Sequence, residues 1–267
     1  MNSVRIVLVE TSHPGNIGSC ARAMKTMGFD ALYLVNPRCF PHPQAIDLSA
    51  GSEDLLEKAV VVDDLAKALT GCGQIFMTSA RARSIALPGL TPRQAAEKVV
   101  LNIYSSLSPV PTNHTKNHAL CEGRGSSAKS IAFVFGRESS GLSNAELLQG
   151  HYQIHIPSVD NYSSLNIAQA VQIICYELRI SSLSPEAHVA THQDNIASFE
   201  ATERFFNHLA EVLHEIGFLR EVAPRRLMER MRRMYGRIQL EEPEVNLLRG
   251  MLKRVQYSLR KRSVLDI

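Results

Sequence analysis

The stretch FGRESSGLS, residues 135–143, follows an apolar run, IAFVF, residues 131–135. The run has the β-branched and aromatic composition of a buried strand. The stretch after it carries an arginine–glutamate pair between two glycines, Gly136 and Gly141. Glycine permits a close backbone approach or a positive φ angle. Two interpretations follow: an ordinary surface turn, or a loop shaped to hold a ligand.

The first two thirds of the chain repeat this alternation of strand and polar turn. Runs with strand composition lie at residues 4–10, 31–35, 58–63, 74–79, 131–135 and 152–156. Helical spacing of apolar residues, or helix start and stop signals, mark residues 16–28, 63–71, the segment opened by Thr91 and Pro92, and residues 164–181. Strands that alternate with helices predict an α/β fold with a mostly parallel sheet and helices on both faces.

Two segments interrupt the alternation. Residues 108–130 are rich in Ser, Pro, Asn, His and Gly, which indicates a flexible surface insertion. Residues 182–194 have the composition of a linker. Beyond them, apolar residues recur at helical spacing, and Pro224 and Pro243 stand where helices can start. We therefore expect one domain at residues 1–181 and an all-helical extension at residues 195–267.

Composition excludes several classes of protein. The five cysteines are scattered and form no CxxC pair, which is typical of a reduced cytoplasmic protein. No apolar run reaches 18 residues, so no membrane span is expected, and the first residues do not have the regions of a signal peptide. Two histidine pairs at i,i+4 spacing lie in loop-like composition without partners at ligand spacing, so no metal site is expected.

Charge is unevenly distributed. Residues 220–262 contain 13 Lys and Arg against 5 Asp and Glu, a local balance of +8 in a chain whose net charge is +3. The remainder of the chain therefore carries −5. Such asymmetry favours an anionic partner for the C-terminal end. The alternative is a solvated basic helix face without a partner.

Four polar turns follow predicted strands. They are ETSHPGNIGS at residues 10–19, TSARARS at 78–84, FGRESSGLS at 135–143 and IPSVDNYSSLN at 156–166. Loops beyond the carboxyl ends of parallel strands build the ligand crevice of an open α/β sheet, so four such turns favour a binding site over four surface turns. HPGNIGS matches neither the dinucleotide fingerprint nor the P-loop spacing, which argues against a standard Rossmann dehydrogenase or NTPase.

Three segments together carry a resemblance to a known family. NIGSCARAMKTMGF (16–29), FGRESSGLS and YSSLNIAQAVQIICYEL (162–178) resemble the signature motifs of the SPOUT methyltransferases, in their TrmH-like branch. The match covers residues 4–180. It implies a deep trefoil knot that forms a slot for S-adenosylmethionine, and a homodimer. The insertion at 108–130 is longer than the family pattern suggests.

The resemblance assigns roles to individual residues. The residues implied to line the cofactor slot are Thr78, Ser79, Ala80, Gly136, Ile156, Ser163, Ser164 and Leu165. Arg22 occupies the position of the family's catalytic arginine and would face the slot of the partner subunit. Because a guanidinium stays protonated, we expect it to stabilise a developing alkoxide or to clamp a phosphate rather than to act as a base. The alternative is a solvated helix-surface charge.

Three polar residues are expected to support the site. Asn16 would orient its turn or Arg22, and Asn166 would stabilise the knotted loop. Glu138 would pair with Arg137 or Arg22 and hold its loop, or else it is an ordinary turn charge. The expected RNA contacts are Arg81, Arg83, Arg232 and Arg233.

The N-terminal segment and TSARAR narrow the expected function further. They resemble the branch members that methylate the ribose 2′-hydroxyl of pyrimidine 32 in the tRNA anticodon loop, so tRNA is the expected partner. Two alternatives stay open at this point: a related enzyme acting on rRNA or another tRNA position, and a non-catalytic RNA-binding protein with the same fold. The basic C-terminal helices would bind tRNA or mainly support the dimer.

Overall fold

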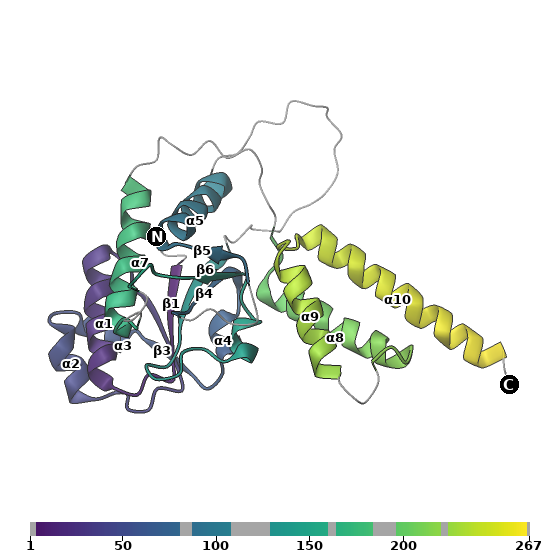
Figure 1. Cartoon of the computed structure of the whole chain (residues 1–267), viewed down its shortest axis with the longest axis horizontal. Helices are drawn as coiled ribbons and strands as arrows, with labels where there is room; N and C mark the ends of the chain where they lie inside the picture. Colours follow the sequence, from purple (N-terminus) through teal and green to yellow (C-terminus); the bar gives the residue numbers. More distant parts are fainter. Residues whose placement is uncertain are drawn as a thin grey trace, which may run out of the picture.

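The sheet is built from strands that all run in the same direction. The computed structural model describes residues 4–80, 87–107, 129–159, 164–183, 196–219 and 224–265. The strands are β1 (Val4–Val9), β2 (Ala31–Val35), β3 (Val60–Val62), β4 (Cys72–Thr78), β5 (Gly89–Leu90), β6 (Ser130–Phe135) and β7 (Tyr152–Ile154). Their order is β3-β2-β1-β6-β4-β7-β5, and each pairing is parallel (Figure 1). The predicted parallel sheet is confirmed.

Helices cover both faces of this sheet. One face carries α1 (Pro14–Met27), α2 (Pro43–Ser49), α3 (Glu53–Glu57), α5 (Pro92–Leu107) and α7 (Ile167–Leu183), and the other carries α4 (Leu65–Leu69) and α6 (Asn144–Leu147). Side chains of β1 alternate between the two cores: Ile6 and Leu8 belong to the first, Val7 and Val9 to the second. This alternation is the period of two that a strand imposes, and it confirms the predicted layers.

Local signals set the ends of the helices as the sequence predicts. Gly28 ends α1 with a φ of +82°, a conformation that glycine adopts without strain. Thr91 caps α5: its hydroxyl accepts from the amide of Gln94, whose side chain accepts from the amide of Thr91. The helix predicted from residue 164 begins at Ile167 instead, because residues 164–166 form a loop. The residue patterns do not predict α2, α3, α6 or β5.

The C-terminal part of the described chain is a helical module. It comprises α8 (Phe199–Glu215), α9 (Pro224–Gly236) and α10 (Glu242–Leu265), around a core that includes Phe205, Phe206 and Leu209. Pro224 begins α9 and Pro243 lies in the first turn of α10, as expected. Residues 184–195 of the predicted linker and residues 108–128 of the predicted insertion lie outside the described residues.

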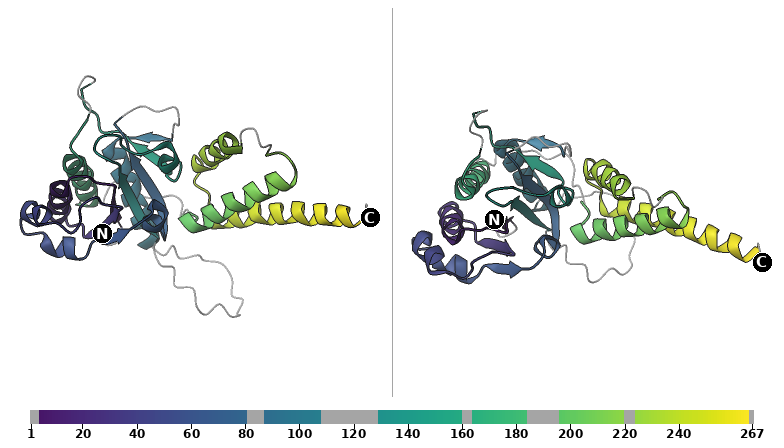
Figure 2. Two further views of the ribbon diagram at one scale, coloured as in Figure 1. Left: turned by 90° about the horizontal axis from the view of Figure 1, so that it is seen from below. Right: turned by 60° about the horizontal axis from the view of Figure 1, so that its bottom comes forward.

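The module docks at the amino ends of the strands. Lys129, next to the start of β6, donates to the carbonyl of Ile196 and to Glu242. Gly71, which precedes β4, donates its amide to Glu200 at 2.5 Å, and Phe199 is buried in the second core of the sheet. Figure 2 shows the module beside the sheet, with α10 extending away from it. The trefoil knot stays a prediction, because residues 160–163 of the connection to α7 lie outside the described residues.

We expect Gly18→Ala to destabilise the protein. A Cβ on Gly18 of α1 would lie 2.1 Å from the carbonyl oxygen of Ala45 in α2, so the two helices would have to separate. Overpacking of this kind costs about 1–3 kcal/mol, measured by thermal unfolding. Gly250→Ala in α10 is the control: nothing lies within 4 Å of its Cβ position, and the change should raise stability by up to about 1 kcal/mol. A Gly18→Ala protein as stable as the parent would contradict this packing.

Candidate functional site

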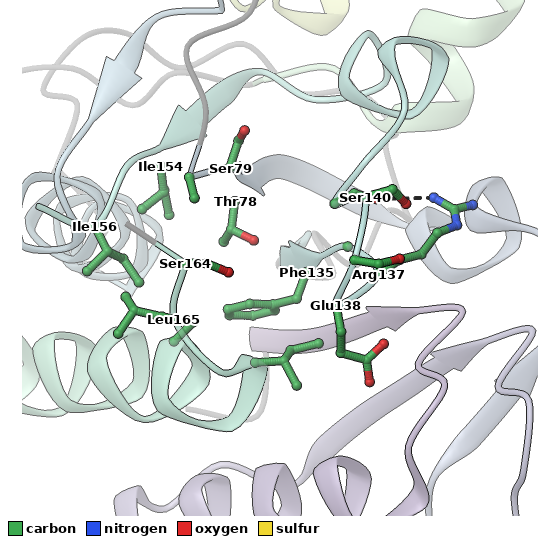
Figure 3. Close-up of a pocket in the computed structure, with 16 residues that line it drawn as sticks. Thr78, Ser79, Phe135, Arg137, Glu138, Ser140, Ile154, Ile156, Ser164 and Leu165 are labelled. Atoms are coloured by element: carbon green, nitrogen blue, oxygen red, sulfur yellow. Dashed lines mark hydrogen bonds between the residues drawn. The ribbon is translucent and has the colours of Figure 1, made fainter. Parts of the chain in front are cut away.

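A cavity of about 360 Å³ lies at the carboxyl ends of β4, β6 and β7 (Figure 3). It is lined by Thr78, Ser79, Ala80, Phe135, Gly136, Arg137, Glu138, Ser139, Ser140, Gly141, Ile154, Ile156, Ser164, Leu165, Ile167 and Ala170. The structure thus brings together seven of the eight residues expected to line the slot. The eighth, Ser163, lies outside the described residues, as do Arg81 and Arg83.

The cavity has apolar walls with hydroxyl groups among them. Ile156 and Leu165 face each other across one end, and Ser164 points its hydroxyl toward the space between Thr78 and Phe135 (Figure 3). The hydroxyl of Thr78 donates to the carbonyl of Val134 at 2.9 Å, which fixes its rotamer. Apolar walls with a few fixed polar groups, at a volume of ~300–1,000 Å³, are typical of sites for nucleoside-sized ligands.

The loop after β6 forms one wall of the cavity and depends on both of its glycines. The amide of Arg137 donates to the carbonyl of Gly141 at 3.3 Å, and the amide of Gly141 donates back at 2.9 Å. A Cβ on Gly136 would lie 2.3 Å from the carbonyl carbon of Gly141, and Gly141 itself has a φ of +68°. The stretch FGRESSGLS is therefore a closed loop that shapes a cavity.

An arginine clamp fastens this loop to its surroundings; we use that name for Arg137 with its partners Glu10 and Glu146. Arg137 donates to both oxygens of Glu10, at 2.8 and 2.6 Å, and to both oxygens of Glu146, at 3.0 and 2.9 Å. These bonds lower the pKa of Glu10. Burial by itself would raise the pKa of Glu146, but hydrogen bonds from Arg137 and Ser143 outweigh it and leave the pKa lowered.

Each carboxylate of the clamp is held by its own backbone environment. Glu10 has a φ of +48°, which is uncommon for a residue other than glycine, and its amide donates to the carbonyl of Val35 at 2.7 Å. Glu146 belongs to a capping box with Ser143 at the start of α6. Arg137 therefore joins the end of β1 to α6 through the loop that it occupies.

The predicted pairing of Glu138 is wrong. Its carboxylate pairs with neither Arg137 nor Arg22: it accepts from the amides of Ser12, at 3.1 and 3.2 Å, and of His13, and from the Ser12 hydroxyl. The carboxylate points away from the cavity toward the N-terminus of α1 (Figure 3), where the helix dipole and free amides favour an anion. The turn after β1 supplies those donors, and the sequence alone does not reveal that Glu138 lies within their reach.

Asn16, Glu138 and Asn166 form one hydrogen-bonded chain. The Asn16 side chain donates to Glu138 at 3.0 Å and accepts from the side chain of Asn166 at 3.0 Å. Asn166 also accepts from the amide of Ala168 at 2.8 Å, at the start of α7. Burial would raise the pKa of Glu138, but the bonds from Asn16, Ser12 and His13 leave it lowered. The chain ties α1, the cavity loop and α7 together.

The predicted arginines have different surroundings. Arg22 lies on the exposed face of α1 and is not among the residues that line the cavity of its own chain. Arg232 of α9 pairs with both oxygens of Glu203 and lies 4.5 Å from the ring centroid of Phe206, so it belongs to the packing of the module. Its neighbour Arg233 is exposed. Because an α-helix has 3.6 residues per turn, consecutive side chains point in different directions, and Arg232 and Arg233 therefore have different surroundings.

Sequence reasoning missed several residues of this region. The lining residues that were not among those expected in the slot include Phe135, Ser139, Ser140 and Ile154. Each of these four nevertheless belongs to the FGRESSGLS motif or to a predicted strand. Within the described residues, no group of three or more His, Cys, Asp or Glu could hold a metal ion. In the same part of the chain, no helix has the length and apolarity that crossing a bilayer requires.

Comparison with known proteins places the chain in a family. Residues 3–176 match the SpoU rRNA Methylase family, and residues 200–264 match the C-terminal domain of the tRNA methyltransferase TrmJ. The chain belongs to the SpoU methylase family. It is 44% identical over 262 residues to a tRNA (cytidine/uridine-2′-O-)-methyltransferase TrmJ of Sodalis glossinidius, covering 97% of this chain and 93% of the relative. The corresponding Photorhabdus laumondii protein is 42% identical, over 96% and 98% of the two chains.

Solved structures agree with this placement. The crystal structure of TrmJ from Z. mobilis superposes with a TM-score of 0.75 at 26% identity, covering 94% of this chain and 98% of that one. A probable methylase family protein from Haemophilus influenzae superposes with a TM-score of 0.58 at 38% identity, covering 100% and 99%. The similarity extends over both the sheet and the helical module.

We expect Glu10→Gln to weaken the arginine clamp in a pH-dependent way. The lowered pKa of Glu10 means that its carboxylate stabilises the fold above its unfolded pKa of ~4.3, and that this contribution disappears as pH falls through the folded value. Because the side chain of Glu10 is 40% exposed, the loss at pH 7 is about 1 kcal/mol, or ~2–4 °C in Tm.

Thermal melts of the parent and variant from neutral to acid pH test this expectation, and the two curves should converge at the acid end. Glu211→Gln, at an exposed position of α8, serves as the control and should follow the parent throughout. A constant gap between parent and Glu10→Gln across the pH range would contradict the role of the ion pair.

Proposed function

We propose that this chain is an S-adenosylmethionine-dependent tRNA methyltransferase that modifies the ribose 2′-hydroxyl of pyrimidine 32 in the anticodon loop. The observation that carries the proposal is the cavity lined by two of the three motifs that resemble the methylase family, residues 135–143 and 162–178, together with residues 78–80. The chain is also similar over nearly its whole length to tRNA (cytidine/uridine-2′-O-)-methyltransferases. The family description also names rRNA, so an rRNA target is the second candidate.

The cavity suits this cofactor in shape and in charge. Its apolar walls fit an adenine ring, and the backbone of the loop after β6 offers amides and carbonyls at close range. Among the described residues that line the cavity, the one arginine is Arg137. Its charge is neutralised by the carboxylates of Glu10 and Glu146. Two carboxylates against one guanidinium leave this wall with more negative than positive charge, which favours a sulfonium cation.

S-adenosylmethionine supplies an activated methyl group when bound, so the protein's task is to place the ribose oxygen in line with it. A guanidinium group already carries its proton, so the side chain of Arg22 is not assigned the role of a base. We assign it the stabilisation of the oxygen as it loses its proton, or the clamping of the adjacent phosphate. Water or a phosphate oxygen then receives the proton.

Arg22 acts on the cavity of a second subunit in this proposal. Two observations support this: Arg22 is exposed on α1, and the cavity lining of its own chain does not contain it. The proposal thus includes a homodimer, with residues 1–181 as the catalytic domain and residues 195–267 as the basic extension. Arg81 and Arg83 would position RNA phosphates, which fixes register without reading sequence.

The function is tested by mapping ribose methylation in tRNA from cells with and without the protein. The proposal expects 2′-O-methylation to disappear at pyrimidine 32 and to persist at other tRNA positions and in rRNA. Loss at another site would reassign the target. Calorimetry with S-adenosylmethionine in the absence of RNA tests the cofactor separately, so that the two parts of the proposal can fail independently.

We expect Ser164→Trp to abolish cofactor binding without unfolding the protein, because the indole would fill the cavity. The parent chain has no tryptophan, so the new side chain also reports its own environment by fluorescence. Val159→Trp is the control: Val159 is 69% exposed and lies outside the cavity lining, and this variant should bind normally. Normal cofactor binding by Ser164→Trp would move the site elsewhere.

We expect Arg22→Ala to lower kcat by ~10²–10³-fold, the scale for removing one preorganised charge stabiliser, with little change in cofactor affinity. Mixing two inactive variants tests the partner arrangement. A dimer of Arg22→Ala with Ser164→Trp keeps one intact cavity opposite one intact arginine, so activity should reappear after subunit exchange. Failure to recover activity in verified mixed dimers would place Arg22 and the cavity in the same chain.

A further inference from the structure

The helical module touches the same three strands that line the cavity, but at their opposite ends. Lys129 at the start of β6 and Gly71 before β4 hold the module through the bonds described above. At β7, the hydroxyl of Tyr152 donates to the side-chain oxygen of Gln239, which lies between α9 and α10. The module therefore contacts the amino ends of β4, β6 and β7, whose carboxyl ends line the cavity.

Between these two ends, the three strands carry a stack of aromatic rings. Phe76 of β4 lies nearly parallel to Phe133 of β6, with ring centroids 4.8 Å apart, and its centroid is 5.3 Å from that of Tyr152 in β7. The strand register sets this arrangement, because Phe76 pairs with Phe133 on one side and with Tyr152 on the other. Aromatic pairs across neighbouring strands stabilise their relative position. We call these three residues the aromatic stack.

Each ring of the aromatic stack lies two residues before a residue of the cavity lining. Phe135, Thr78 and Ile154 follow the three rings at this spacing in β6, β4 and β7, and all three line the cavity (Figure 3). Residues two apart in a strand lie on the same face, about 7 Å from each other. The stack is therefore the layer of side chains next to the cavity, and a shift of Tyr152 moves Ile154 with it.

The position of β7 depends on contacts at its ends. The strand has three residues and lies between β4 and the two-residue β5, so it makes few ladder bonds of its own. The module supplies two contacts at its amino end. One is the bond between Tyr152 and Gln239, and the other is the end of α9, where a Cβ on Gly236 would lie 3.8 Å from the carbonyl oxygen of Gly150.

The module holds Gln239 in an uncommon backbone conformation. Its φ is +46°, in the left-handed region that residues other than glycine seldom occupy. The next residue, Leu240, is buried, and its carbonyl accepts from the amide of Ala197 at 2.8 Å. Such a conformation persists where the surrounding contacts over-determine it. The packing of the module therefore directs the side chain of Gln239 to Tyr152.

We propose that Tyr152 and Gln239 are positioning residues that couple docking of the helical module to cofactor binding through the aromatic stack. With the module docked, their bond fixes β7, and the stack holds the spacing of Phe135, Thr78 and Ile154 in the cavity wall. Linkage requires the converse: a cofactor in the cavity strengthens the docking of the module. The identity of the cofactor as S-adenosylmethionine rests on the proposed function; the coupling of module and cavity does not.

A double-mutant cycle on cofactor affinity, in the full-length chain, tests the coupling. Tyr152→Phe keeps the ring in the stack and removes only the hydroxyl, and Gln239→Ala removes the acceptor. Each should raise the Kd for S-adenosylmethionine about 3- to 10-fold, the range that the loss of one hydrogen bond allows. The double variant should bind no more weakly than the weaker single variant, because both changes remove the same bond. A purely structural role would lower the Tm and leave the Kd unchanged.

Two variants of the module serve as matched controls. Tyr257→Phe removes a hydroxyl from an exposed position of α10, and Gln256→Ala removes amide bonds to His208 and Glu215 that stay within the module. Both should keep the Kd of the parent. An unchanged Kd in both variants of the Tyr152–Gln239 pair, or losses that add in the double variant, would overturn the proposal.

Hydrogen exchange separates this proposal from the proposed function. The amide of Ser79 donates to the carbonyl of Ile154 at 3.0 Å, so without cofactor it should exchange faster in both variants than in the parent. The amide of Glu10, bonded to Val35, should exchange at the parent's rate. This pattern in a parent that fails to bind S-adenosylmethionine would contradict the proposed function and support the coupling. Unchanged exchange at Ser79 would overturn the coupling.

Discussion

The arginine clamp is the interaction on which the cavity depends. Arg137 lies between Glu10 and Glu146 and saturates both carboxylates, and its loop closes through the two backbone bonds to Gly141. Without the guanidinium, the carboxylates of Glu10 and Glu146 would face each other without a counter-charge. The N–H groups of Arg137 are occupied by these bonds. A ligand in the cavity therefore meets backbone groups and negative charge at this wall, and no free cation.

The hydrogen-bonded chain of Asn16, Glu138 and Asn166 completes the wall from the other side. Glu138 is fixed by the free amides at the start of α1, and Asn166 caps the start of α7 while holding Asn16. Two helix N-termini and one loop thus share a single polar network. A network in which each member satisfies its neighbours positions a site more rigidly than separate contacts would.

Charge is divided between the two ends of the sheet. The carboxyl ends carry the cavity with its acidic wall, and the amino ends carry the module with the exposed arginines of α9. The net charge of +3 does not show this division: residues 1–194 contain 15 Lys and Arg against 16 Asp and Glu, and residues 195–267 contain 14 against 10.

Features that depend on short-range patterns can be predicted from the residues alone. The period of two in β1, the stop at Gly28, the reciprocal cap at Thr91 and the glycine-bounded loop at residues 136–141 follow from local sterics and hydrogen bonding, so a reader of the residues can predict them. Motif similarity added seven of the sixteen residues that line the cavity. The short α2, α3 and β5 carry too few residues for a period to emerge.

The pairing of charged side chains, by contrast, depends on how the strands and helices pack. Glu138 could have paired with its neighbour Arg137, but parallel packing of β1 beside β6 brings Glu10 to Arg137 and the turn after β1 to Glu138. Likewise Arg232 and Arg233 are neighbours in the sequence, yet the packing of α9 on α8 leaves Arg232 half-buried beside Glu203 and Arg233 in solvent. Ion-pair partners depend on distances across the fold, and a one-dimensional pattern does not contain them.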